Sequence, residues 1–287
     1  PNSAFEVITG GVNLTYYIRE DKVLNAEFTK MNYLAQQPGG LTDLEFRTAP
    51  FTSKRERNWF AIDWNLWSIN YKHTFNSKNI LNTKVFGLFA SRKALGFLGQ
   101  INRADPLTER NLIVGEFNNI GLESKLLKIY DIKELPQALL IGVRLYNGNS
   151  IGQQGFGTAS SNPDFYFIDQ SEHEFSDYRF PSYNGAIFLE NIFRLSPKTS
   201  LIPGIRAEYI KTSASGVYNT ITTDLAGNII DNTTFTQNLS NERSFIIFGL
   251  GLNHDIKSDS LSLYANFSQN YRSINFTDMQ IVNPNFR

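Results

Sequence analysis

The sequence contains no cysteine among its 287 residues. This excludes thiolate metal sites, cysteine nucleophiles and disulfide cross-links. Long apolar runs are also missing, since the longest strongly apolar stretch extends only from Phe245 to Leu252. A transmembrane helix needs about 20 apolar residues. A membrane protein with this sequence is therefore possible only as a β-barrel.

An excess of charge of either sign is absent as well. Lysine and arginine number 27, aspartate and glutamate number 27, and the net charge is zero. The sequence thus gives no electrostatic argument for nucleic acid as a partner.

The signatures of catalysis and of resident cofactors are missing too. We find no nucleophile elbow, phosphate loop, dinucleotide fingerprint or paired catalytic carboxylates. The sole cluster of histidine with carboxylates, Glu172–His173–Glu174, has no second histidine at ligand spacing. We expect no enzymatic activity, no cofactor and no resident metal.

Aromatic residues are abundant, at 14% of the chain, and they gather on long strand-like runs. The stretch 57–97 holds two such runs joined by the polar turn Asn76–Asn79. Each run exceeds the usual strand of about 5–6 residues. A strand that crosses a bilayer at a tilt needs about 9–11 residues.

Alternation with period two recurs along the whole chain and predicts about ten strands. One face carries Leu, Ile, Val, Phe and Tyr. The opposite face carries Glu27, Glu123, Lys125, Arg144, Glu190, Arg206, Glu208 and Asn266. The phase changes near Leu66–Trp67, where we predict a β-bulge. Phe86 and Leu88 lie in phase with Lys84, so we expect them inside, against an internal plug.

Connections between the strands alternate in length. Short turns are predicted near residues 20–22, 76–79, 132–136, 196–199 and 257–260, and long loops at 35–56, 98–116, 147–177 and 213–242. A compact soluble domain rarely has such loops. Transmembrane barrels have short periplasmic turns, long extracellular loops and aromatic girdles, here Tyr71, Phe75, Tyr130 and Phe193 near the turns. The fold class is therefore all-β, part of a large antiparallel transmembrane barrel.

Three segments resemble one family. They are Asn32–Asp43 (NYLAQQPGGLTD), Arg57–Leu66 (RNWFAIDWNL) and Tyr264–Arg287 (YANFSQNYRSINFTDMQIVNPNFR). The chain is similar to the TonB-dependent outer-membrane receptors, in particular the ferric-citrate-receptor-like branch common in Bacteroidetes. The resemblance implies a 22-stranded barrel closed by an N-terminal plug and energised by TonB–ExbB–ExbD. Within residues 1–287 we find no signal peptide, TonB box, plug or terminal aromatic strand, so we expect residues 1–287 to be one partial barrel domain of a longer receptor.

The basic cluster Lys54, Arg55 and Arg57 lies where the first long loop enters a strand. Arginine and lysine bind anions by charge-assisted hydrogen bonds, so we predict contact with an anionic iron chelate. The same cluster is also compatible with lipopolysaccharide phosphates or with a solvated loop base. Gln36 and Gln37, beside Pro38–Gly40, are further candidate ligand contacts through their side-chain amides.

The predicted function is uptake of a ferric chelate, such as ferric citrate, by a receptor in the bacterial outer membrane. Its partners would be the chelate, the TonB–ExbB–ExbD complex through the plug, and outer-membrane lipid and lipopolysaccharide. Haem, cobalamin, a glycan or a peptide are alternative cargoes on the same scaffold. A soluble β-sandwich binding module and a barrel enzyme are less favoured, because the strands are too long for the first and no Ser/His/Asp constellation supports the second.

Overall fold

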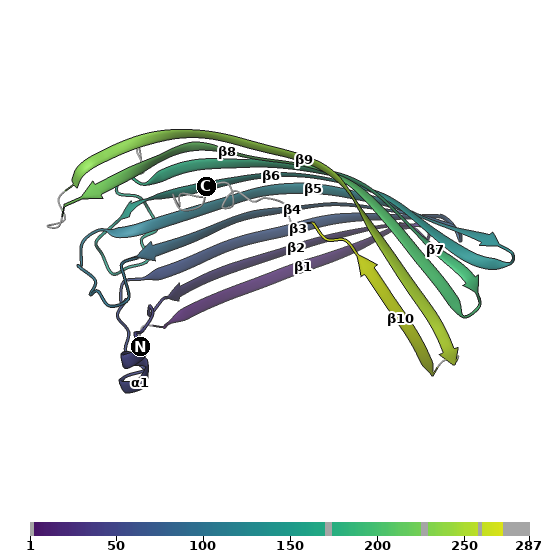
Figure 1. Ribbon diagram of the computed structural model, residues 1–287, viewed down its shortest axis with the longest axis horizontal. Coiled ribbons are helices and arrows are strands. Elements are labelled where there is room, and N and C mark those ends of the chain that lie inside the picture. The colour runs from purple at the N-terminus through teal and green to yellow at the C-terminus, as the bar shows by residue number, and fades with distance from the viewer. Residues whose placement is uncertain (1–2, 170–173, 225–228, 258–259, 272–287) are drawn as a thin grey trace.

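The computed structural model describes residues 3–169, 174–224, 229–257 and 260–271. They form ten strands and one short helix (Figure 1). The elements are β1 (Phe5–Arg19), β2 (Lys22–Gln36), α1 (Asp43–Thr48), β3 (Trp59–Asn76), β4 (Asn79–Gly96), β5 (Arg110–Ile132), β6 (Leu135–Gly157), β7 (Ser176–Ser196), β8 (Thr199–Thr223), β9 (Ile229–Lys257) and β10 (Leu261–Ser268). No helix in the described ranges is long and apolar enough to cross a membrane.

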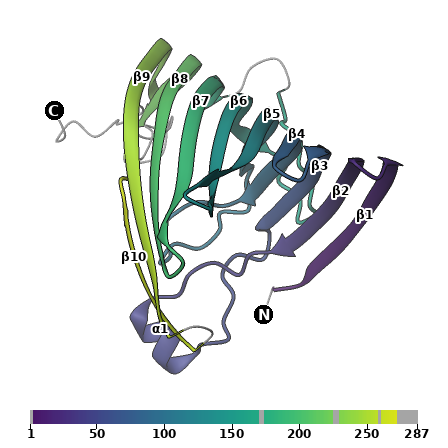
Figure 2. The same ribbon diagram turned by 90° about the vertical axis from the view of Figure 1, so that its right-hand side faces the viewer.

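All ten strands belong to one antiparallel sheet in the order β1 to β10, so each strand pairs with its neighbours in the chain. The sheet curves like a section of a cylinder wall, with a concave and a convex face (Figure 2). The prediction of about ten strands in an antiparallel barrel wall is confirmed.

Tight turns join the strands at one end of the sheet, which we call the turn end. They fall between Arg19 and Lys22, Asn76 and Asn79, Ile132 and Leu135, and Ser196 and Thr199. In the third turn Lys133 and Glu134 have φ of 51° and 65°. Two consecutive positive φ values match the type I′ turn, whose twist suits a two-residue hairpin. The predicted turn at 257–260 includes residues 258–259, which lie outside the described residues.

Longer connections join the strands at the opposite end, which we call the loop end. The described ones are 37–58, which contains α1, and 97–109. The next connection follows Gly157. The predicted loops are therefore too long at three places. β5 begins at Arg110, β6 continues to Gly157, and most of 213–242 belongs to β8 and β9.

The strand extension at 213–242 has a physical cause that the hydrophobic pattern does not register. Thr220 pairs with Thr233, and the hydroxyls of Ser213 and Ser240 are 3.1 Å apart. Threonine favours strands even when both faces are wet. A segment with polar residues on both faces lacks hydrophobic alternation, so it was predicted as a loop, although here it forms a pair of antiparallel strands.

The convex face is apolar over the half of the sheet nearest the turn end. Its side chains include Leu14, Phe28, Ile69, Val85, Leu122, Val143, Ile187, Ile205, Phe248 and Leu263, which the strand registers place on one face. Many of them are exposed, as expected for a surface that contacts lipid. The register also puts the predicted girdle residues Tyr71, Tyr130 and Phe193 on this face, whereas Phe75 lies in the register shift between Thr74 and Asn76.

A second aromatic group borders this apolar band toward the loop end. Phe28 pairs with Trp67, and the Trp67 ring stacks on Phe89 with centroids 6.4 Å apart. Gly87, the partner of Trp67 across the strands, makes room, because a Cβ there would lie 2.6 Å from the indole. We call Phe28, Trp67 and Phe89 the outer girdle.

The predicted bulge at Leu66–Trp67 is wrong. The β2–β3 register runs unbroken from Lys22↔His73 to Gln36↔Trp59. The phase changes because the chemistry of the faces changes: beyond Trp67 the convex side carries Asn65 and Asp63, whereas Leu66 and Trp64 face the concave side. The side chains still alternate regularly between the two faces, and what changes beyond Trp67 is which face carries the apolar residues.

Two small cores lie near the loop end. On the convex side Leu95, Leu112, Val114 and Phe167 pack together, with Phe165 against them. On the concave side Tyr178, Phe180 and Ala214 pack with Tyr218 and Leu239. The first core shows that the connection following β6 folds back over the outer wall.

Candidate functional site

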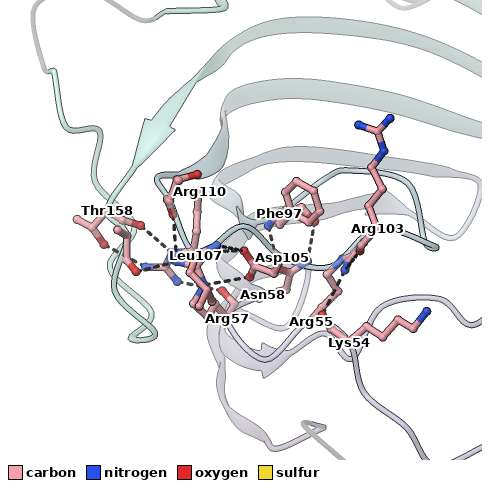
Figure 3. Close-up of polar contacts among 12 residues, drawn as sticks. Lys54, Arg55, Arg57, Asn58, Phe97, Arg103, Asp105, Leu107, Arg110 and Thr158 are labelled. Carbon is pink, nitrogen blue, oxygen red and sulfur yellow. Dashed lines mark hydrogen bonds and ion pairs between the residues drawn. The ribbon is translucent and has the colours of Figure 1, made fainter. Parts of the chain in front are cut away.

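Arg57, just before β3, ties three connections together at the loop end (Figure 3). Its Nε and Nη2 donate to the two carboxylate oxygens of Asp105 at 3.0 and 2.5 Å. Its Nη1 donates to the carbonyls of Thr108 and Ala159 at 3.1 and 2.7 Å. Arg57 is only 5% exposed, so this contact set is desolvated. The guanidinium fork suits such bidentate pairing.

Arg110, the first residue of β5, completes this cluster and is fully buried. It donates to the Thr158 carbonyl and hydroxyl at 2.8 and 3.1 Å, and to the Arg57 carbonyl at 3.0 Å. Asp164 lies 3.9 Å away and offsets part of the charge. We call Arg57, Asp105, Arg110, Thr158 and Asp164 the loop clamp.

The Arg55 side chain binds backbone carbonyls of the connection 97–109. It is 4% exposed, and its guanidinium donates to the carbonyls of Gly99, Gln100 and Arg103 at 3.2, 2.9 and 3.0 Å. The guanidinium also lies 4.8 Å from the ring centroid of Phe97. These contacts use most of its donors, and they join loop 37–58 to loop 97–109.

Lys54 and the two glutamines lie nearer to solvent. Lys54 forms an ion pair with Glu45 and donates to the Ile101 carbonyl at 3.3 Å. Gln36 is the last residue of β2 and is half-buried, and the Gln37 side chain is exposed. The predicted site residues therefore share one end of the sheet, but Arg55 and Arg57 are buried in loop contacts, whereas Lys54, Gln36 and Gln37 remain accessible in part.

Helix α1 is fixed by a capping box. The Glu45 amide donates to the Thr42 hydroxyl at 3.4 Å, and the Thr42 amide donates to the Glu45 carboxylate at 2.9 Å. Two otherwise unpaired amides are thereby satisfied. The side-chain hydrogen bond from Lys54, together with the Thr42 amide, lowers the pKa of Glu45 to about 2.

The acids of the loop clamp are held in their charged form. Hydrogen bonds from the Arg57 side chain lower the pKa of Asp105, against the opposing effect of burial. Hydrogen bonds from the Ser160 hydroxyl, and next from Thr158, lower the pKa of Asp164. The clamp is thus a set of charges that stay ionised through the neutral range.

A second constellation lines the concave face. Phe86 of β4 covers Gly121 of β5, where a Cβ would lie 2.4 Å from the ring. The Arg144 guanidinium lies 5.3 Å from the Phe86 centroid and 3.6 Å from the Glu123 carboxylate. The expectation that Phe86 faces inward is confirmed, and its packing partner is the sheet itself.

The same arrangement occurs two strands further along. Phe188 covers Gly142, and the Arg206 guanidinium lies 5.5 Å from the Phe188 centroid. Arg206 also donates to Glu208 at 2.6 Å. Cation–π contacts of this kind contribute about 0.5–2 kcal/mol each. The predicted polar face is therefore an ordered ladder of arginine, aromatic ring and carboxylate.

Near the loop end of this face a third arginine lacks a carboxylate. The Arg92 guanidinium lies 5.4 Å from the Phe60 centroid, and the ring of Tyr33 meets Phe60 edge-on at 6.1 Å. Within the described residues no acidic side chain pairs with Arg92. Exposed on the concave wall, this cation is available to an anion.

Local sequence patterns contain only weak signals for several of these residues. The contacts of Arg57 and Arg110 in the loop clamp span 48 to 102 positions, and no local pattern reports them. Arg92 could have been found from its phase, since it lies in phase with Lys84, Phe86 and Leu88. Glu172 and His173 lie outside the described residues. Among the described residues no group of three or more metal-ligand side chains occurs.

The profile of one family, described as "TonB dependent receptor-like, beta-barrel", matches residues 11–287. The chain belongs to the TonB-dependent receptor family. Members of this family are outer-membrane transporters and not enzymes, and in barrels of this kind the short turns are periplasmic and the long loops are extracellular. No curated protein matches the chain.

Several solved receptors share this fold. The ferric citrate transporter FecA in its unliganded form superposes with a TM-score of 0.77 at 18% identity, covering 96% of this chain and 38% of FecA. The ferric-catecholate import receptor Fiu from E. coli K12 in its open form gives 0.69 at 9% identity, covering 93% and 47%. The copper transporter OprC gives 0.59 at 13% identity, covering 92% and 37%. The receptor chain thus spans less than half the length of each of these relatives.

Proposed function

We propose that this chain forms part of the wall of an outer-membrane receptor that imports a ferric chelate, of ferric-citrate type, with energy from TonB–ExbB–ExbD. The likeness to FecA, a ferric citrate transporter, and to Fiu, a ferric-catecholate receptor, supports the cargo class. The apolar convex face and the charged concave face support a wall between lipid and a polar lumen.

The observation that carries the proposal is the arginine at position 92. It is exposed on the concave wall near the extracellular end, lies over Phe60, and has no carboxylate partner in the described part of the chain. Ferric chelates built on carboxylates are anions. A guanidinium over a ring still has N–H groups that can donate to such an anion.

The arginines of the concave face that lie nearer the turn end are less suited to capturing the chelate. Arg144 and Arg206 lie closer to the turn end than Arg92 and are matched by Glu123 and Glu208. Balanced charges bind an anion weakly, because each arginine already has a carboxylate partner. We assign the first capture of the chelate to Arg92 and to accessible loop side chains.

In this proposal the five residues singled out in the sequence divide into two roles. Arg55 and Arg57 hold loops 37–58 and 97–109 in place, because their donors are used by carbonyls and by Asp105. Lys54, Gln36 and Gln37 have the more accessible side chains and are the ones proposed to reach the chelate.

Uptake by cells that express the full-length receptor tests the proposal. Radioactive iron supplied as ferric citrate should accumulate in a TonB-dependent manner, and Arg92→Gln should reduce the uptake at least tenfold at limiting chelate. Lys198→Gln, which removes a lysine from a turn on the periplasmic side, serves as the charge-matched control and should leave uptake unchanged.

Other cargoes give different results in the same assay. If the cells took up haem, cobalamin, a glycan or a peptide instead of iron, the ferric chelate would be ruled out as the cargo, but the assignment to the receptor family would stand. OprC shows that a copper transporter shares this fold. Recovery of the full-length protein in the soluble fraction without detergent would overturn the membrane location itself.

A further inference from the structure

Arg55 joins two connections, 37–58 and 97–109, by bonds to the backbone alone (Figure 3). In the described part of the chain all four of its hydrogen bonds go to carbonyls, and three of these carbonyls belong to 97–109. A backbone carbonyl cannot turn away without moving the chain that carries it. The contact therefore fixes the path of 97–109 and not merely the orientation of one side chain.

The backbone of 37–58 is shaped around the same arginine. Gly39 has a φ of 80°, and a Cβ there would lie 2.4 Å from Cγ of Arg55. Both the positive φ and the close approach favour glycine. Position 39 therefore leaves room for the Arg55 stem, which a larger residue would displace.

Asn58 links the same two connections at a second point. Its side-chain amide donates to the Phe97 carbonyl at 3.3 Å, and its side-chain oxygen accepts from the Phe97 backbone N–H at 2.9 Å. Asn58 is buried. Arg57 and Arg110 then attach both connections to 158–168. The three connections form one packed unit.

Separating 97–109 from 37–58 would break all the bonds between them in one step. Hydrogen bonds from a charged donor are the stronger ones, and Arg55 would lose three of them. Loops that close over a bound molecule come from the least stable parts of a structure. The two connections lie at the other end of that range.

We propose that Arg55 and Arg57 are positioning residues for cargo capture, and that this side of the receptor mouth stays fixed while cargo binds. The inference rests on the proposed function. The two arginines hold the connections in a single arrangement, in which Lys54, Gln36 and Gln37 are already accessible in part. A loop that is held in its binding conformation binds without the cost of ordering it. Any closing movement belongs to other parts of the receptor.

A disulfide between the two connections tests this proposal, because the chain has no cysteine of its own. A Cβ added at Gly40 would lie 4.0 Å from the Cβ of Ile101, within the range of about 3.5–4.5 Å that disulfides span. Gly40→Cys/Ile101→Cys should therefore cross-link in the full-length receptor. Iron supplied as ferric citrate should enter cells equally fast before and after oxidation. Uptake that oxidation stops and reduction restores would overturn the proposal, because the two connections would then have to separate.

The same disulfide distinguishes positioning from direct contact with cargo. Arg55→Gln should raise the ferric citrate concentration for half-maximal uptake about tenfold and leave the maximal rate unchanged, because the connections then spend only part of the time in the binding arrangement. Oxidised Gly40→Cys/Ile101→Cys, added to Arg55→Gln, should restore the wild-type concentration. Each single cysteine in the Arg55→Gln background is the matched control and should not restore it. A disulfide cannot replace an arginine that binds the chelate, so a cross-link that forms without restoring uptake would refute the positioning role.

A distance measurement on the purified full-length receptor keeps this test apart from the test of cargo. Spin labels at Phe51→Cys and Leu98→Cys, both exposed positions, report the separation of the two connections at neutral pH. We expect one narrow distribution that ferric citrate does not change, and a broad distribution once Arg55→Gln is added. A broad or cargo-dependent distribution without Arg55→Gln would overturn the fixed arrangement. Narrow distributions in a receptor that imports no iron would refute the proposed function and leave the fixed arrangement standing.

Discussion

Arg57 and Asp105 lie 48 residues apart in the chain, yet they share two parallel hydrogen bonds of 3.0 and 2.5 Å at the loop end of the sheet. Their side chains are 6% and 9% exposed. Removing one partner of a buried ion pair leaves an uncompensated charge and costs about 3–5 kcal/mol. The pair therefore determines how firmly three loops are held on the wall.

Arg57→Gln should loosen loops 97–109 and 158–168 without unfolding the strands. The reason is that the variant leaves Asp105 charged and loses the bonds to Thr108 and Ala159. Hydrogen exchange of the full-length receptor should accelerate in these loops by at least a hundredfold and remain unchanged in β7. Lys78→Gln, which breaks an exposed ion pair with Asp131 at the turn end, should alter neither loop. Unchanged exchange in Arg57→Gln would show that the pair is not what holds the loops.

Acid should loosen loop 37–58 through Glu45. Its pKa of about 2 in the folded loop lies below the ordinary glutamate value of 4.5, so the folded loop binds fewer protons than the open one. Its stabilising contribution is complete above about pH 4.5 and falls as pH drops from there through about 2. Because this chain has no cysteine, a spin label on Phe51→Cys can report loop mobility. Mobility should rise as the pH falls through this window, and Glu45→Gln should already be mobile at pH 6. A label whose mobility does not depend on pH in the wild-type background would contradict this account.

Glycine at positions 121 and 142 is required by the rings above it. An added Cβ would lie 2.4 Å from Phe86 or 2.2 Å from Phe188, so the ring and the arginine stacked on it must move. Gly121→Ala should lower the free energy of unfolding by about 1–3 kcal/mol, measured by urea unfolding in detergent micelles. At Gly10 a Cβ meets nothing within 4 Å, so Gly10→Ala is the control. Adding Phe86→Ala to Gly121→Ala should recover part of the steric cost, as a double-mutant cycle would show.

Two exposed apolar residues should differ in how strongly a lysine substitution destabilises the receptor. Ile187 on the convex band is 64% exposed and Leu44 on α1 is 70% exposed. Lysine in place of Ile187 should destabilise the inserted receptor by about 2–4 kcal/mol, because that face contacts lipid. Lysine in place of Leu44 should be nearly neutral, since α1 lies beyond the strands at the loop end. Equal tolerance of both, measured as folded receptor in the outer membrane, would argue against the assigned lipid face.

Alternation allowed the strands and their faces to be predicted wherever the two faces meet different solvents. Glu123, Arg144 and Arg206 were placed correctly because lipid and lumen impose opposite chemistry on alternate residues. Beyond the girdle both faces are wet, and the rule no longer applies. The polar ribbon of β8 and β9 therefore looked like a loop, and the inversion at Trp67 looked like a bulge.

The candidate site could be predicted less fully than the wall. The cluster of Lys54, Arg55 and Arg57 signalled a charged loop base, but the partners of Arg55 and Arg57 come from connections 44 to 102 residues away. Whether an arginine is buried or accessible depends on those loops, which carry no periodic pattern. Arg92 is the opposite case, because its phase on β4 is that of Lys84 and Phe86 and points to the concave face, although Arg92 was not among the predicted site residues.

Pairing of every strand with its neighbours in the chain also bears on how such walls change over evolutionary time. A hairpin can be duplicated or lost without rerouting any connection, because the strands on either side simply pair with each other instead. Circumference then varies in steps of two strands while the inside–outside alternation is preserved. The pore can be resized without a new topology being invented.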